Sequence, residues 1–292
     1  MLDLLLSEWI AREGATMTKS EFMKDLVRPI ALAWVFVSFG SLLAFFLEVF
    51  LDIEVSTSLT SVITFVFAAF AAFYLFPRVI RLPFADVELS EYLHRLGFYL
   101  PQNAWKHVLL GFLLAVCTLS GMLIGSLLSG RYELDWSTVN ISHTIFSINP
   151  GIWEEFFFRG VIVFVVLRAV RSVKRAMAIQ IVLFGLTHIK GTDLWAWVDV
   201  ITVMVLAVAF TYSAYKTRTL IAGIVFHFLH DVFLFLPQVP GAEKIGTFEN
   251  VAFFASLWVM VGVACILIKI SSEHLGVKAE EDLYILDKVS AL

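Results

Sequence analysis

The residues best suited to chemistry are two adjacent glutamates and an arginine, Glu154, Glu155 and Arg159, at the head of an apolar run. Ionisable groups cost roughly 2.5–3.5 kcal/mol each on insertion into a membrane, so such a cluster favours a functional site over a solvated face. Glu155 and Arg159 are four residues apart with the acid first, the better order for a helical ion pair. Glu154 lies about 100° around an α-helix from Glu155, so we expect it to face elsewhere. A charged helix start at the membrane surface is the alternative.

Two further apolar stretches carry polar side chains of the kind that enzymes use. His188 closes the sequence Phe-Gly-Leu-Thr-His, and His227 precedes Asp231 by four residues, so this last pair shares one face of a helix. His230 is three residues from His227 and could stand in for it. A lone histidine on an apolar helix is more often a packing residue. Three separate helices that each bring acid or imidazole to an apolar core favour one common site.

The composition is that of an integral membrane protein. Hydrophobic residues make up 60% of the chain and charged residues 16%, whereas soluble domains are about 45–50% apolar and about 25% charged. The expected surroundings are therefore a lipid bilayer. No basic tract is present, so we expect no nucleic-acid partner. Cys117 and Cys265 both lie in apolar runs, so we expect neither a disulfide framework nor a cysteine metal site.

Hydropathy predicts an all-α, polytopic membrane protein with about eight transmembrane helices around an intramembrane catalytic cavity. Each spanning helix needs about 20 apolar residues. The stretches that qualify or nearly do so are 30–51, 57–77, 106–129, 150–170, 176–190, 195–215, 219–237 and 250–270. They predict a single membrane domain over 30–270. An amphipathic N-terminal segment, 1–29, precedes it, and a C-terminal tail, 271–292, follows it.

Basic residues predict the orientation. Of the 20 Lys and Arg residues other than Arg159, which lie in the loops, the termini or the ends of the expected helices, 17 fall on the side that holds both termini. Because positive residues stay on the cytoplasmic side, this bias predicts that both ends of the chain are cytoplasmic. The same topology places the candidate site residues in the non-cytoplasmic half of the bilayer.

The motif set resembles that of a known family. Glu-Glu-x3-Arg at 154–159, Phe-x3-His at 184–188 and His-x3-Asp at 227–231 are similar to the motifs of the CAAX protease and bacteriocin-processing (CPBP, or Abi) family. These are intramembrane endopeptidases related to the type II CAAX prenyl protease. The resemblance covers about residues 100–240. The prenyl protease usually has Asn where this chain has Asp231, and wider family members have either residue.

The resemblance implies a role for each matching residue. One glutamate, with His188, would activate water to attack a peptide carbonyl, and His227 would donate to the developing oxyanion. A carboxylate in apolar surroundings is a better general base, which suits this role. Asp231 would orient His227 or His188, and Arg159 would hold one glutamate in place. By spacing, that glutamate is Glu155, which leaves Glu154 as the expected base.

The substrate implied is a membrane-associated peptide or lipidated protein, prenylated or not, and no cofactor is expected. A zinc-dependent version, with Glu154, His188 and His227 as ligands, is the alternative, although His-Glu-x-x-His is absent. A transporter that relays protons through buried Glu and His is another class. It is disfavoured because we find no repeat and no pair of broken helices. A non-catalytic immunity protein on the same fold also stays open, as does the oligomeric state.

Overall fold

The computed structural model describes residues 27–54, 56–79, 88–128, 133–170, 172–189, 191–234, 237–238 and 247–277. The helices are α3 (Arg28–Leu51), α4 (Thr57–Phe70), the π-helix η2 (Ala71–Leu75), α5 (Phe76–Val79), α6 (Leu89–Arg95), α7 (Ala104–Leu128), the 3₁₀-helix η3 (Trp136–Thr138), α8 (Ile141–Asn149), the π-helix η4 (Pro150–Ile162), α9 (Val163–Val170), α10 (Val173–Leu186), α11 (Leu194–Thr217), α12 (Ile221–Phe233) and α13 (Thr247–His274). Two short strands, β1 (Glu133–Leu134) and β2 (Pro237–Gln238), pair antiparallel. The expected all-helical class is confirmed.

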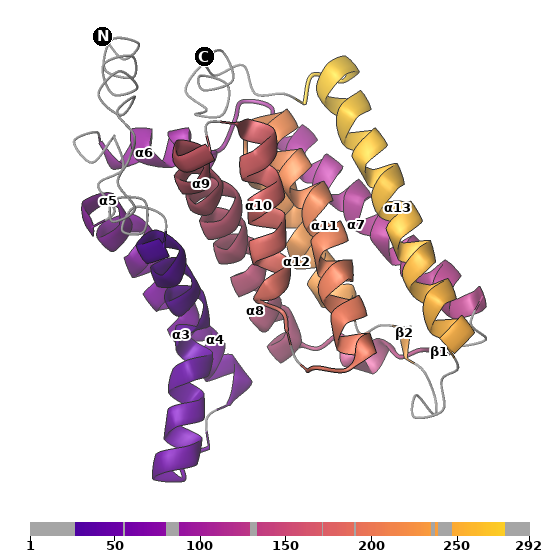
Figure 1. Cartoon of the computed structure of the whole chain (residues 1–292), viewed down its shortest axis with the longest axis horizontal. Helices are drawn as coiled ribbons and strands as arrows, with labels where there is room; N and C mark the ends of the chain where they lie inside the picture. Colours follow the sequence, from indigo (N-terminus) through magenta and orange to yellow (C-terminus); the bar gives the residue numbers. More distant parts are fainter. Residues whose placement is uncertain are drawn as a thin grey trace.

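The long helices run up and down in one bundle (Figure 1), in which α7 packs along both α12 and α13. The start of α7 meets the end of α13, where the Asn103 amide donates to the Gly276 carbonyl at 2.6 Å and Lys106 Nζ donates to the Leu275 carbonyl at 3.0 Å. The β1–β2 pair lies at the opposite end of the bundle (Figure 1). α3 and α4 form a pair at the edge of the bundle, and α4 packs against α8.

Every stretch that hydropathy selected contains helix, with altered boundaries. The expected helix 150–170 begins earlier, at Ile141, because α8, η4 and α9 follow one another without a break. The expected helix 176–190 is α10, which ends at Leu186, so His188 lies in the turn beyond it. Most of the expected N-terminal segment and of the C-terminal tail lies outside the described residues.

Among the described residues, three helices are long and apolar enough to cross a membrane: Ala104–Leu128, Leu194–Thr217 and Val251–His274. Leu59–Leu75 and Ile221–Phe233 are apolar but shorter. Large apolar side chains face outward on the edge helices, such as Phe45 and Phe50 on α3. This exposure is what a bilayer accommodates and water does not. The chain is a membrane protein, and the count of eight spans and the cytoplasmic termini stay predictions.

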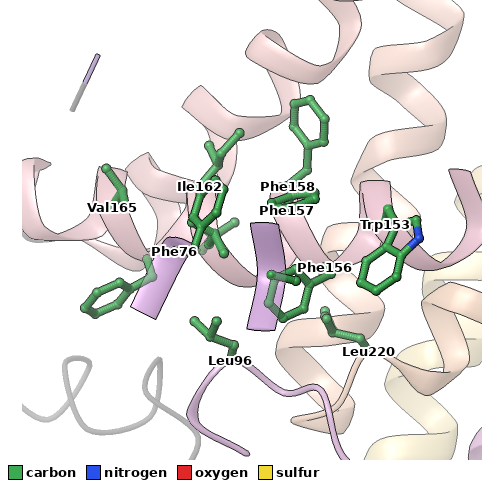
Figure 2. Packing of buried hydrophobic residues seen from close by; sticks show 14 of the residues in the cluster. Phe76, Leu96, Trp153, Phe156, Phe157, Phe158, Ile162, Val165 and Leu220 are labelled. Atoms are coloured by element: carbon green, nitrogen blue, oxygen red, sulfur yellow. The ribbon is translucent and has the colours of Figure 1, made fainter. Parts of the chain in front are cut away.

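The centre of the fold is η4 together with α9. Apart from the partly exposed Glu154, their side chains are buried from Trp153 to Leu167. Figure 2 shows Phe156, Phe157 and Ile162 of this segment with Phe76 and Leu220 from other parts of the chain. A helix that is apolar all round is a central one. The glutamate pair is therefore carried by the most enclosed helix of the bundle.

Candidate active site

The helix that carries the glutamates is a π-helix rather than an α-helix. Pro150 stands inside the continuous helical segment, where its ring lacks an N–H and clashes with the carbonyl of Phe146. The wider winding begins at this proline and continues to Ile162. A π-turn contains more residues than an α-turn, so neighbouring side chains point in more similar directions. Glu154 and Glu155 are thus closer in direction than α-helical spacing predicts.

Glu155 is the buried member of the pair. Its side chain is fully enclosed, and its Oε1 lies 3.1 Å from Nη1 of Arg159, so the expected ion pair is confirmed. The same oxygen lies 2.8 Å from Nδ1 of His227 on α12. One carboxylate oxygen therefore joins the arginine of its own helix to the histidine of another.

Arg159 is held by aromatic faces as well as by its acid. Its guanidinium lies 4.0 Å from the ring centre of Phe184 and 5.0 Å from that of Phe210. Within the described part of the chain its nitrogens make no hydrogen bond of normal geometry. Desolvated cation–π contacts are worth about 2 kcal/mol or more. The rings of α10 and α11 thus stabilise a charge that would otherwise be costly to bury.

His227 has carboxylates at both of its ring nitrogens. An ionised Glu155 can only accept, so Nδ1 of His227 donates to it and Nε2 is left facing the other way. Nε2 lies 3.8 Å from Oδ2 of Asp231 and 4.0 Å from Oε2 of Glu154. The shared face of His227 and Asp231 is confirmed. Among the described residues Arg159 forms an ion pair with Glu155 and not with Glu154, as the spacing predicted. The sequence did not predict that both acids would approach one imidazole.

The two sides of His227 differ in exposure. The side chains of Glu155 and Arg159 are completely buried. Those of Glu154 and Asp231 are 18% and 21% exposed. The Nδ1 side of the imidazole is therefore a closed ion-paired cluster, which we call the buried half of the site. The Nε2 side, with Glu154 and Asp231, is the open half.

The comparisons with known proteins agree with these motifs. Residues 136–233 match the sequence model of the family described as type II CAAX prenyl endopeptidase Rce1-like. The matched stretch is about a third of the chain, and it contains all three motifs. The resemblance seen in the motifs is thereby confirmed, and the family is one of proteases. No curated protein and no solved structure matches the chain.

The matched region runs from η3 to the end of α12 and contains every residue expected in the site. His188 nevertheless lies apart from the carboxylates. Its Nδ1 donates to the Phe184 carbonyl at 2.9 Å, and its ring packs on the Phe184 ring at 4.8 Å between centres. Among the described residues it forms no ion pair with Glu154 or Glu155. Its Nε2 is left available at the end of α10.

His230 does not take the place of His227. It is buried on the α7 side of α12, where its Nδ1 lies 3.3 Å from the Thr118 hydroxyl. That hydroxyl donates to the Ala115 carbonyl at 3.1 Å. The Thr118 oxygen is therefore the acceptor for His230. Only His227 of the two histidines contacts the carboxylates.

Two residues of the matched region that join helices of the bundle were missed in the sequence. Nε2 of His143, on α8, donates to the Asp231 carbonyl at 2.9 Å. The Asn149 amide donates to the Ser61 carbonyl of α4 at 2.8 Å. The sequence feature that could have revealed them is Asn140, a typical helix-capping residue. Its side chain accepts from the His143 backbone N–H at 2.8 Å and caps α8. A predicted helix that began at Asn140 would have included His143 and Asn149 in the same helical segment as the two glutamates.

The arrangement does not fit the zinc alternative. In the described ranges no group of three His, Cys, Asp or Glu side chains is placed to hold a metal ion. Zinc needs its ligand atoms at about 2.0–2.2 Å around one point. Of the proposed ligands, Glu154 and His227 are neighbours, whereas His188 bonds within its own helix end.

Proposed function

We propose that this protein is an intramembrane endopeptidase that cleaves a peptide bond of a membrane-associated, CAAX-type substrate with activated water. The observation that carries the proposal is the His227 imidazole between the closed Glu155–Arg159 pair and the partly exposed Glu154 and Asp231. The match to a family of prenyl endopeptidases supports the reaction class. The substrate is proposed to approach from the open half, where Glu154 and Asp231 are partly exposed.

Glu154 is the proposed general base. Its side chain is partly exposed, its buried Oε2 faces Nε2 of His227, and it has no arginine partner in the described part of the chain. It accepts a proton as the water oxygen attacks the carbonyl carbon. A positioned base contributes about 10²–10⁴-fold to such a step.

His227 is the proposed oxyanion donor. Glu155 holds Nδ1, so a protonated ring presents Nε2–H to the open half. That N–H donates to the oxygen that becomes negative when the carbonyl is attacked, an interaction worth roughly 2.7–4 kcal/mol in a dry site. Asp231, at 3.8 Å, favours the protonated ring and helps to orient it.

Collapse of the tetrahedral intermediate completes the reaction. Glu154 returns its proton to the leaving nitrogen, the C–N bond breaks, and a carboxylic acid and an amine are released. The Nε2 of His188 makes no hydrogen bond among the described residues, and His188 is proposed to assist the proton transfer once substrate is bound. Catalytic contacts often tighten only in the substrate complex.

We propose that catalysis needs no metal. Purified protein should keep its activity after exhaustive chelation and contain no stoichiometric zinc. Activity that chelation abolishes and zinc restores would instead assign Glu154, His188 and His227 as ligands.

The test of the function is cleavage of defined peptides in detergent or in vesicles. One peptide carries a prenylated C-terminal CAAX cysteine, and a second has the same sequence without the lipid. Gly262→Ala serves as the control variant, since a methyl group there meets no atom within 4 Å. Cleavage by wild type and Gly262→Ala, but not by Glu154→Gln, is the expected result. Equal cleavage by Glu154→Gln would exclude the proposed base.

A further inference from the structure

Gly223 on α12 makes the space in which the Glu155 carboxylate lies. It precedes His227 by one helical turn, so both residues are on the same face of α12. A Cβ atom at position 223 would lie 2.9 Å from Oε2 of Glu155 and 3.6 Å from its Cδ. The first distance is shorter than side-chain carbons tolerate. Only glycine lets this carboxylate approach the helix so closely.

The two oxygens of Glu155 have different surroundings. Oε1 is shared by Arg159 and His227, at 3.1 and 2.8 Å. Oε2 is buried, makes no hydrogen bond among the described residues, and rests against Gly223. Displacement of Oε2 turns the whole carboxylate, so it also moves Oε1 away from its two partners. The glycine therefore controls the contact that orients the His227 ring.

We infer that Gly223 is a positioning residue: its missing side chain sets the carboxylate of Glu155 so that Nδ1 of His227 is held and Nε2 faces the open half. The inference rests on the proposed function for its effect on catalysis. The effect of Gly223 on the position of the Glu155 carboxylate depends only on the packing of α12 against η4.

The informative variant is Gly223→Ala, because its effects on stability and on activity are expected to diverge. Glycine is disfavoured inside a helix relative to alanine, and the atom that the new methyl meets is the end of a flexible side chain. The fold should therefore survive, with a melting temperature equal to that of wild type or higher by about 2–4 °C. Turnover should fall by about 100-fold, as for a misplacement of about 1 Å. Gly262→Ala should retain wild-type turnover.

A double-mutant cycle identifies the partner through which Gly223 acts. Glu155→Asp draws the carboxylate back by one methylene and so makes room for the alanine. Glu155→Asp should lower turnover in the wild-type background. In the Gly223→Ala background the fold-loss of turnover caused by Glu155→Asp should be smaller by a factor of at least about three, since the two side chains are in contact. Additive effects of the two substitutions would overturn the assignment.

A spectroscopic measurement separates this inference from the proposed reaction. The ¹⁵N resonances of the His227 ring, assigned by comparison with His227→Gln, report whether Nδ1 carries the proton and donates it. We expect Gly223→Ala to change them and Gly262→Ala to leave them as in wild type. Unchanged His227 resonances would refute the positioning role. If wild type cleaves no peptide while the resonances still respond, the proposed function fails and the positioning role stands.

Discussion

The buried half and the open half of the site use the same kinds of residue under opposite conditions. Glu155 and Glu154 are neighbours in sequence and contact the same imidazole. Glu155 is enclosed, paired with Arg159 and hydrogen-bonded to His227. Glu154 is partly exposed and lies at the longer distance of 4.0 Å from the ring. Surroundings rather than residue type distinguish the two acids.

The difference indicates a division of labour. A carboxylate that is already neutralised by an arginine and a histidine is suited to hold a ring in place. A carboxylate without such partners is suited to exchange protons with water or substrate. Adjacent carboxylates with separate tasks set by their environments are a recurrent solution in enzymes. Each prediction below perturbs one half and measures whether the other half responds.

The largest loss of activity is expected from Glu154→Gln. The amide fills the same volume but cannot accept a proton from water, so turnover should fall by about 10²–10⁴-fold. The melting temperature should stay near that of wild type, because the side chain is partly exposed and is not paired with an arginine. Turnover and thermal unfolding in detergent are the measurements.

Substitutions in the buried half are expected to reduce stability as well as activity. Glu155→Gln leaves Arg159 as a buried charge without its acid, and Arg159→Ala leaves the buried Glu155 with His227 but without its arginine. Breaking a buried ion pair in this way costs about 3–5 kcal/mol. The double variant should lose less stability than the sum of the two single losses. If Glu155→Gln is stable but catalytically inactive while Glu154→Gln is active, the roles of the two glutamates are reversed.

Much of this site follows from the sequence, and the remainder has a common physical cause. Ionisable residues are rare in apolar helices, so Glu154, Glu155, Arg159, His227 and Asp231 stood out, and their spacing gave the correct ion pair. The π-helix could not be foreseen from α-helical spacing, and it changed where Glu154 points. The separate position of His188 depends on where α10 ends. Gly223 and Phe210 act only through packing, which leaves no polar signal in the sequence.

Phe210→Leu should have an intermediate effect, and it tests whether the aromatic wall belongs to the buried half. The Phe210 ring stacks on His227, with 4.6 Å between centres and 26° between planes, and also faces Arg159. Removal of this wall should lower turnover by up to about 30-fold, because a desolvated cation–π contact is worth about 2 kcal/mol. Phe76→Leu is the matched control. Phe76 is equally buried and packs on Phe157, a residue outside the ion-paired cluster. Equal turnover in the two variants would show that the Phe210 ring does not contribute to the activity of the site.

The smallest effect is expected at His143, which ties the helix segment of Glu154 to the end of α12 that carries Asp231. Its Nε2 donates to the Asp231 carbonyl, a bond worth about 0.5–1.5 kcal/mol to the fold. His143→Ala should therefore lower the melting temperature by a few degrees, at about 2–4 °C for each kcal/mol. Turnover should fall less than about 10-fold, since the bond positions only the open half. His143→Gln retains an N–H donor and should recover most of both losses. Ile141→Ala, on an exposed side chain of the same helix, is the control. If His143→Gln is as impaired as His143→Ala, the imidazole acts through its charge or its ring, and the link between α8 and α12 is not its contribution.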